Sequence, residues 1–349
     1  METSDTASKR PRLEIEDDDQ LQELQELAAS ARRRRERIRQ EVGQLRELQE
    51  LAASARRRRE RIRQEIGKLD QPSVSHPQDV ASHPQDVVSR PEDAVSHPQD
   101  VVSRPEDAVS HPQNVVSRPR SVLQLSNPTF DTKLPFPFVG YTVPTRFHLD
   151  GEGDEENWFY TGREKFTELF DKFKHLIKDR RYVTLILYGT RGYGKSHLLA
   201  ALVCYLAAKE ERVVYIPDCR SFIGNPVDDM VSAMLFAWAD DESMQQRIMT
   251  LNTQDDISQF LRSQKNVIFV VDQTNAFEDE VGDNGETAKE KAEVFRWLRR
   301  CRTRHKAIFG SSANNRTILS GALRQSNHEI MYVYGGLPVV NIKGNNSFT

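Results

Sequence analysis

The sequence predicts an α/β fold in which helices cover both faces of a five-stranded, mainly parallel sheet, making three layers. The first observation is an apolar, β-rich run at 183–188, followed at once by a glycine-containing loop and then by apolar residues at helical spacing. The second is another apolar run, 267–272, that ends in an acid. Further β-type runs at 212–217, 307–310 and 330–334 supply the remaining strands. Short, wholly apolar runs are typical of strands that a parallel sheet buries on both faces.

Composition divides the chain of 349 residues into four zones. Hydrophobic residues make up 37%, below the roughly 45–50% of globular chains, so part of the chain is expected to lack a packed core. We expect a charged tail at 1–20, a duplicated helical segment at 21–69, a disordered spacer at 70–124 and the α/β domain at 125–349. The net charge of −3 favours neither nucleic acid nor an acidic partner.

The helical segment at 21–69 contains a tandem duplication with a period of 24 residues. Residues 24–43 read LQELAASARRRRERIRQEVG, and residues 48–67 read LQELAASARRRRERIRQEIG. Strong helix formers, the absence of proline and apolar residues three, four or seven apart predict a helix with one apolar stripe. We therefore predict a coiled coil or another homo-oligomer through 21–69, although a period of 24 gives the second copy a phase slip in a heptad seam.

Residues 71–122 repeat a seven-residue unit such as SHPQDVV or SRPEDAV. A proline in every unit prevents a continuous helix, and units this polar cannot bury a core, so a flexible spacer is expected. Its histidines are not expected to hold a metal, because nothing fixes their geometry. The three cysteines lie far apart in the sequence, which favours reduced, buried thiols over disulfides or a zinc site.

The glycine loop GTRGYGKS at 189–196 fits the pattern GxxxxGK[ST] in the strand–loop–helix context that the pattern requires. Glycines let backbone N–H groups face a phosphate, and the helix N-terminus adds partial positive charge. We expect Lys195 to reach the β- and γ-phosphates and the Ser196 hydroxyl to bind Mg²⁺. The sequence thus predicts a P-loop NTPase that binds ATP and Mg²⁺ through Gly189, Thr190, Arg191, Gly192, Tyr193, Gly194, Lys195 and Ser196.

Asp272 ends the second apolar run in the Walker B form, which makes it the expected carboxylate for Mg²⁺. A strand between the glycine loop and this acid resembles the additional-strand branch of P-loop NTPases, where a Glu usually follows the Asp and polarises water. Here Gln273 follows, and an amide can orient water but cannot take a proton. Lys195, Asp272 and Gln273 are the candidate catalytic residues, with slow hydrolysis expected. The acids at 278–280 are either a substitute base or a solvated loop.

Two further segments add candidates around the nucleotide. The polar stretch after the strand at 307–310 places Ser312 and Asn314 where that branch senses the γ-phosphate. Upstream, FYTGRE at 159–164 resembles the box that precedes the P-loop in AAA-like and STAND ATPases. That resemblance implies that Arg163 helps to enclose the adenine.

The ordered motifs FYTGREKF, LYGTRGYGKSHLLAALVCYLAA, ERVVYIPDCR, FVVDQTNA and YVYGG resemble the NTPase domain of Crinkler-type effectors, and related domains occur in retrotransposon hot spot proteins. The resemblance covers roughly 135–336. It implies a secreted effector that acts in a host nucleus, in virulence or symbiosis. The translocation header of that family is not visible, and little chain follows the fifth strand for a C-terminal effector domain.

A nuclear location is also expected from the basic cluster Lys9, Arg10, Pro11 and Arg12, which is of the nuclear-import type. The arginine runs at 32–35 and 56–59 are either further import signals or solvated helix faces. Host nuclear proteins or nucleic acid are the expected partners. The polar start of the chain does not predict a signal peptide, and no apolar run reaches the roughly 20 residues of a membrane span, so no membrane partner is expected.

Three function hypotheses remain open. The first is a self-associating ATP-binding effector with slow Mg²⁺-dependent hydrolysis. The second is a catalytically silent scaffold in which nucleotide only stabilises the fold, which Gln273 favours. The third, a small-molecule kinase, is weaker, because the inserted strand and the polar tip at 311–315 suit an ATPase better.

Overall fold

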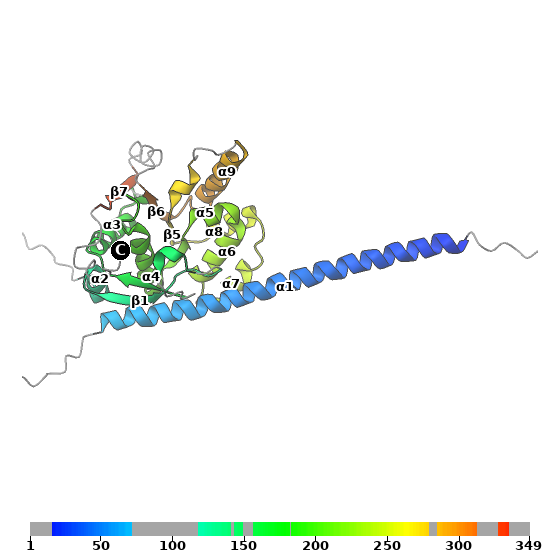
Figure 1. Cartoon of the computed structure of the whole chain (residues 1–349), viewed down its shortest axis with the longest axis horizontal. Coiled ribbons are helices and arrows are strands. Elements are labelled where there is room, and N and C mark those ends of the chain that lie inside the picture. Colours follow the sequence, from blue (N-terminus) through cyan, green and yellow to red (C-terminus); the bar gives the residue numbers. More distant parts are fainter. Residues whose placement is uncertain are drawn as a thin grey trace, which may run out of the picture.

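The computed structural model describes residues 16–71, 118–140, 143–148, 156–181, 183–278, 285–312 and 327–334. The Lys9–Arg12 cluster, Asn314 and most of the seven-residue repeats lie outside these ranges. A body of mixed helices and strands holds most of the described residues, and one long helix runs along its side and projects well beyond it (Figure 1).

A sheet of five parallel strands lies at the centre of the body, in the order β4-β5-β6-β3-β7. Every residue of β3 and β5 is buried, as expected for strands covered on both faces. Strand β6 lies in the sheet between the strand that leads into the glycine loop and the strand that leads into Asp272. The predicted α/β fold with a five-stranded parallel sheet is confirmed; the strands are β3 Thr184–Gly189, β4 Arg212–Ile216, β5 Val267–Val271, β6 Lys306–Ser312 and β7 His328–Tyr332.

Helices flank this sheet, and a separate antiparallel pair of strands borders them (Figure 1). Side chains of Asp218, Asp241 and Thr253 cap the N-termini of α5, α7 and α8 by accepting backbone N–H groups. The remaining elements of the body are α2 Arg120–Ser126, β1 Asp131–Pro135, η1 Thr145–Phe147, β2 Asn157–Thr161, α3 Lys165–Lys178, α4 Lys195–Ala208, α5 Cys219–Gly224, α6 Pro226–Ala237, α7 Glu242–Ile248, α8 Gln254–Ser263, η2 Thr274–Phe277 and α9 Gly285–Cys301.

The long helix is α1, Glu16–Asp70, which spans both copies of the duplicated sequence without a break. Its second copy packs against α2, α4, α6 and β1 and belongs to the same hydrophobic core as the sheet. The buried apolar side chains recur at helical spacing and are Ala52, Ala55, Ile62, Ile66 and Leu69. The second repeat is therefore part of the body.

Two arginines of the second repeat are buried together with this apolar stripe. Arg59 donates to the carbonyl of Ala237 at 2.7 Å and to that of Glu211 at 3.0 Å. Arg58 donates to the carbonyl of Phe138. The last carbonyls of a helix have no partner within it, so Arg59 satisfies acceptors at the C-terminal end of α6. Burial lowers the pKa of Arg59 to about 10, which still leaves it charged at neutral pH.

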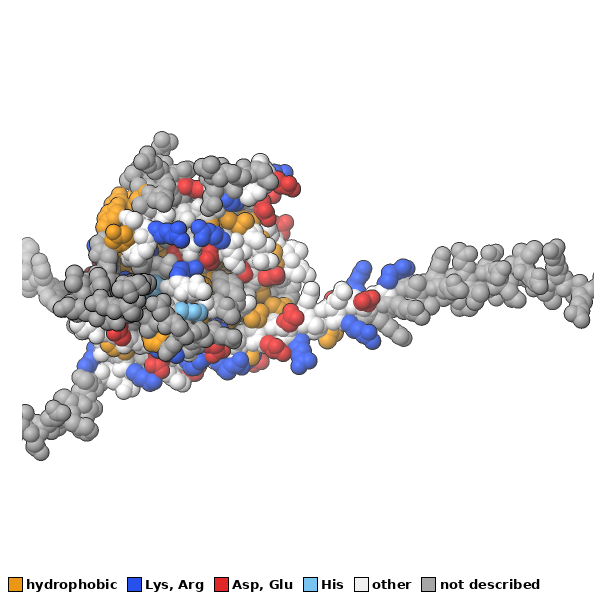
Figure 2. Space-filling view, viewed as in Figure 1, with side chains coloured by type: hydrophobic (Ala, Val, Ile, Leu, Met, Phe, Trp, Pro, Cys, Tyr) orange, Lys and Arg blue, Asp and Glu red, His pale blue; other side chains and the backbone are white. Residues whose placement is uncertain are grey.

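The first repeat makes no such contacts in the part of its surface that the structure describes. All described side chains between residues 33 and 47 are exposed, including Val42 at 62% and Leu45 at 47%. Figure 2 shows charged side chains around this projecting part of the helix. Self-association through 21–69 remains a prediction, and the described side chains of 33–47 offer exposed surface for it.

The three cysteines, Cys204, Cys219 and Cys301, are free and buried. Within the described ranges, no helix is both long and apolar enough to cross a membrane.

Ile66 and Val42 occupy the same position of the two repeats and allow a matched test of the packing. We expect Ile66→Ala to lower the free energy of unfolding by about 2–5 kcal/mol, because it leaves a cavity at a side chain that is 1% exposed. Val42→Ala should change it by less than about 0.5 kcal/mol, since Val42 lies in solvent. Urea denaturation of the full chain measures both; equal losses would contradict the asymmetric packing of the repeats.

Candidate nucleotide-binding site

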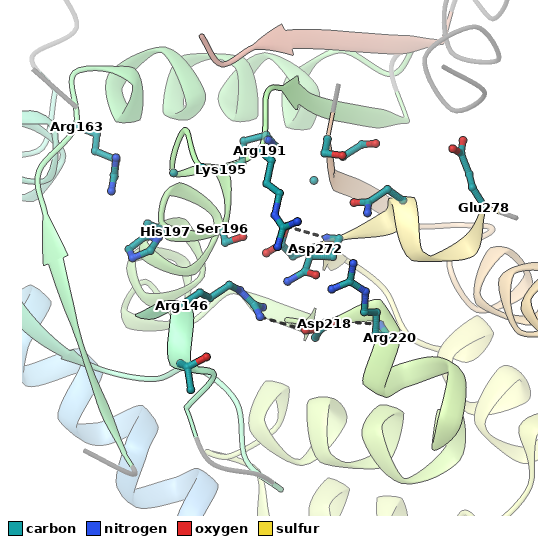
Figure 3. Close-up of a pocket in the computed structure, with 18 residues that line it drawn as sticks. Arg146, Arg163, Arg191, Lys195, Ser196, His197, Asp218, Arg220, Asp272 and Glu278 are labelled. Carbon is teal, nitrogen blue, oxygen red and sulfur yellow. Dashed lines mark hydrogen bonds and ion pairs between the residues drawn. The ribbon is translucent and has the colours of Figure 1, made fainter. Parts of the chain in front are cut away.

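A cavity of about 740 Å³ opens at the carboxyl ends of the central strands, where the glycine loop, Asp272 and the end of β6 meet (Figure 3). Carboxyl ends of parallel strands are where open α/β sheets bind ligands. Five cationic side chains and three acidic ones line it, an excess of two positive charges that suits a polyphosphate; they are Arg146, Arg163, Arg191, Lys195 and Arg220, with Asp218, Asp272 and Glu278.

The glycine loop turns tightly between β3 and α4. Gly192 and Gly194 have φ angles of 87° and 80°, in the left-handed region that favours glycine. A Cβ at Gly194 would also displace the guanidinium of Arg163. Of the eight loop residues, Arg191, Gly192, Gly194, Lys195 and Ser196 line the cavity, Gly189 ends β3 beside it, Thr190 is exposed, and Tyr193 packs partly against the core.

Lys195 lies at the first position of α4, with its ammonium folded over the loop. Its Nζ donates to the carbonyls of Gly189 and Thr190, both at 2.7 Å. Burial lowers the pKa of Lys195, and the nearby carboxylate of Asp272 opposes that shift. The ammonium is therefore held at the mouth of the loop, where a phosphate oxygen can replace the two carbonyls.

Asp272 follows β5 directly and is 2% exposed. Its Oδ1 accepts the backbone N–H of Gln273 at 2.8 Å. The Ser196 hydroxyl lies near enough to oppose the effect of burial on the pKa of this carboxyl. Oδ2 is buried and has no hydrogen-bond partner among the described residues. Burial raises the pKa of Asp272. A hydroxyl beside a carboxylate oxygen with spare acceptor capacity is a donor set that fits Mg²⁺, which prefers oxygen ligands.

Gly310 of β6 lets that carboxylate fit beneath the cavity. A Cβ at this position would meet Oδ1 of Asp272 at 2.5 Å and Cδ1 of Leu199 at 2.7 Å. Strand β6 thus packs closely on Asp272, because it has no side chain at position 310.

Gln273 has a left-handed backbone, with φ at 58°, and its side chain faces Arg146. With the amide oxygen turned toward the guanidinium, it accepts from Nη1 of Arg146 at 2.9 Å. Arg146 comes from η1 and also donates to the carbonyl of Pro217 at 2.7 Å and to Oδ2 of Asp218 at 3.1 Å (Figure 3). The side chain that was expected to orient water is therefore held by an arginine.

His197 lines the cavity on the side of Arg163 (Figure 3). The ring of His197 packs against Phe147 at 4.9 Å and Trp158 at 5.6 Å between centroids. Burial, with nearby arginines, lowers the pKa of His197 to about 3, so its imidazole is neutral at physiological pH. Arg163 lies just after β2, where the sequence predicted a residue near the base, and burial lowers its pKa.

Two predicted groups, the γ-phosphate sensors and the acids at 278–280, are only partly described by the structure. Ser312 lines the cavity at the end of β6, and its neighbour Ser311 has a buried hydroxyl without a partner in the described part of the chain. Glu278 also lines the cavity, whereas the other two acids of that loop lie outside the described residues. The sequence did not predict Arg146, Asp218, Arg220 or His197 as site residues. The last three lie inside the quoted motifs, but no pattern gave them a role.

Fold and cavity together define a P-loop NTPase-like protein with a nucleotide site. The family model described as mitochondrial ribosomal death-associated protein 3 matches residues 161–280, about a third of the chain. This finding overturns the resemblance to Crinkler-type effectors. It overturns the expected host-nuclear location as well, and nothing supports secretion or virulence. The motifs behind the resemblance follow from phosphate and Mg²⁺ chemistry, which P-loop proteins of many families share, so they do not discriminate between families.

No curated protein matches the chain. Among solved structures, AMPPCP-bound DnaA from Aquifex aeolicus is similar at 15% identity with a TM-score of 0.30, covering 53% of each chain. PCH-2 from C. elegans is similar at 15% identity with a TM-score of 0.27, covering 48% of this chain and 42% of its own. The chain spans about half the length of these structures or less.

The raised pKa of Asp272 predicts how stability depends on pH. The folded state binds this proton more tightly than the unfolded state, so the carboxylate makes folding less favourable as pH rises through its titration range. We expect the free energy of unfolding of Asp272→Asn, relative to wild type, to increase as the pH rises from about 4, the ordinary pKa of an aspartate, through the higher pKa of the folded protein. The increase is about 1.4 kcal/mol per unit of pKa shift.

Urea denaturation without nucleotide or Mg²⁺ measures this effect. The exposed control Asp255→Asn should show no comparable trend. A difference between Asp272→Asn and wild type that stays constant with pH would contradict the assigned burial cost.

Proposed function

We propose that the chain binds ATP with Mg²⁺ in this cavity and works chiefly as a nucleotide-binding switch. The observation that carries the proposal is the meeting of Lys195, Ser196 and the half-satisfied carboxylate of Asp272 at the mouth of one loop. A buried acceptor oxygen without a donor is costly, and a bound cation removes that cost.

Each part of the cavity has a role under this proposal. The loop N–H groups and Lys195 would bind the β- and γ-phosphates, while Ser196 and Asp272 would hold the cation. Arg146, Arg191 and the neighbouring Arg220 supply positive charge on the side away from Arg163. The neutral imidazole of His197, which packs on the buried rings of Phe147 and Trp158, would border the base.

Slow hydrolysis is a second candidate, favoured by Glu278 in the lining of the cavity. Gln273 cannot accept a proton, and its amide already bonds to Arg146. A nucleotide that is bound well and hydrolysed slowly suits a switch or a stabilising ligand better than a fast enzyme.

The family match supports a mitochondrial setting, in association with a ribosome, for the same nucleotide-binding role. Fractionation of cells that express the tagged full chain tests this setting. Co-sedimentation with mitochondrial ribosomes is expected, and exclusion of the chain from mitochondria would refute it.

Nucleotide binding is tested by substituting the loop lysine. Wild-type protein should gain thermal stability with ATP and Mg²⁺, and Lys195→Ala should weaken binding at least about tenfold by removing a charge-assisted phosphate contact. Lys289→Ala, an exposed lysine on α9, is the control and should bind normally. Differential scanning fluorimetry and calorimetry measure both; an unchanged affinity in Lys195→Ala would sink the assignment of the loop.

Turnover separates the switch from the silent scaffold. We expect phosphate release by wild type on the order of 10⁻⁴–10⁻² s⁻¹, the range of NTPases without an efficient catalytic base. Lys195→Ala sets the background. Release by wild type no faster than by this variant, with ATP still bound, would favour the scaffold.

A further inference from the structure

The contacts of the second repeat are encoded twice in this chain. The side chains that it buries in the body are Ala52, Ala55, Arg58, Arg59, Ile62, Ile66 and Leu69. Twenty-four positions earlier the sequence has the same residues, with one conservative change; they are Ala28, Ala31, Arg34, Arg35, Ile38, Val42 and Leu45. The first repeat thus repeats each side chain that the second buries, with Val42 in place of Ile66.

The surface that holds the second repeat is an apolar groove with polar recognition points, which we call the docking groove. It is formed by α2, by α4, by β1 with the segment at 136–138, and by the end of α6. The two buried arginines donate to main-chain carbonyls there, and Gln245 donates to the carbonyl of Ala52 at 3.3 Å. An acidic rim, made of Glu156, Glu210 and Glu242, pairs with the outer arginines of the repeat.

The described side chains of the first repeat, Arg34, Val42 and Leu45 among them, are exposed. A shift of 24 residues moves the equivalent face about 36 Å along the helix and turns it by about 120° around the axis. The first face therefore points away from the side on which the body lies. A second body of roughly 200 residues, with a diameter of roughly 40 Å, would sit there without touching the first.

We propose that residues 24–46 form a second docking site, and that its partner is another P-loop body whose docking groove is not filled by a helix of its own. The chemistry of the groove defines this partner: an apolar channel, free carbonyls at a helix C-terminus and an acidic rim. Helix α1 then bridges two such bodies.

One position explains why the chain uses the second repeat for its own groove. Asp70 accepts the N–H of Ser121 at 2.8 Å and the Nζ of Lys209 at 2.9 Å. The equivalent residue of the first repeat is Arg46, which would face Lys209 with a like charge. Val42 in place of Ile66 weakens docking by a further factor of about two to ten. The second repeat therefore binds the docking groove of its own chain more tightly than the first repeat would, which leaves the first repeat for a partner.

The first experiment asks whether the first repeat fits the groove at all. Three variants of the full-length chain are compared. The second-repeat set carries Arg58→Ala, Arg59→Ala and Ile62→Asp, and the first-repeat set carries the matched Arg34→Ala, Arg35→Ala and Ile38→Asp. The double set carries all six substitutions. The first-repeat set should leave the melting temperature unchanged. The second-repeat set should keep much of the wild-type stability, because the first repeat can slide into the groove; residues 71–119 are long enough to follow a shift of about 36 Å. The double set should lose that stability. If the second-repeat set and the double set melt alike, the proposal fails.

The second experiment tests the bridge between two bodies. The double set serves as a receiver with an open groove and is mixed with wild type, whose first repeat is free. Light scattering should show a 1:1 complex that the first-repeat set does not form and that Val42→Ile with Arg46→Asp tightens at least about tenfold. Dimers of wild type alone that need Ile38, without binding to the receiver, would show two first repeats pairing with each other and would overturn the proposal.

Should the receiver prove unfolded by circular dichroism, the first experiment still decides the matter, since it compares full chains that differ by one repeat.

Discussion

The carboxylate of Asp272 is the constraint around which the body is arranged. A buried carboxylate is expensive unless it is hydrogen-bonded or paired, and here one oxygen is satisfied while the other is not. Its position depends on β5 lying next to β4, since its own N–H donates to the carbonyl of Ile216 at 2.9 Å. It also depends on β6 contributing Gly310 rather than a larger residue. The chemistry of the site thus depends on the order of the strands. A different strand beside β5, with a side chain in place of Gly310, would fill the space that the carboxylate of Asp272 occupies.

Arg146 extends that constraint to the cavity wall. One guanidinium reaches the carbonyl of Pro217, the cap residue Asp218 and the amide of Gln273. Asp218 in turn starts α5 by accepting the N–H of Arg220. A negatively charged phosphate that binds near Arg146 would therefore change the hydrogen bonds at the start of α5, because Arg146 contacts the cap residue Asp218 directly. This linkage suits a protein that reports nucleotide occupancy better than one optimised for turnover.

The sequence predicted the parts of the site that lie close together along the chain. Lys195 and Ser196 stand in one loop, and Asp272 ends one strand, so local pattern and phosphate chemistry suffice to find them. Arg146 and Asp218 reach the cavity from separate elements, and their roles exist only once the sheet is assembled. His197 was missed for another reason, because a residue beside a motif carries no signal of what will pack on it. The resemblance to Crinkler-type effectors was wrong because its motifs reflect phosphate and Mg²⁺ chemistry that many families of P-loop proteins share.

The arginine runs also show what the sequence alone leaves undecided, and how much helical spacing adds. A run of four arginines reads as a solvated or import-type cluster, yet Arg58 and Arg59 continue the stripe that Ala55 begins and Ile62 carries on. Helical spacing thus singles out the two arginines that face the body, but not the carbonyls that they meet.

The length of the sequence repeat matters as well. A repeat of 18 or 25 residues would place both faces on nearly the same side, about 27 or 38 Å apart, closer than the roughly 40 Å width of a body. A period of 24 turns the second face by about 120° instead, so that both faces can be filled at once. The spacing that disfavours a heptad seam is therefore one that lets a single helix hold two bodies.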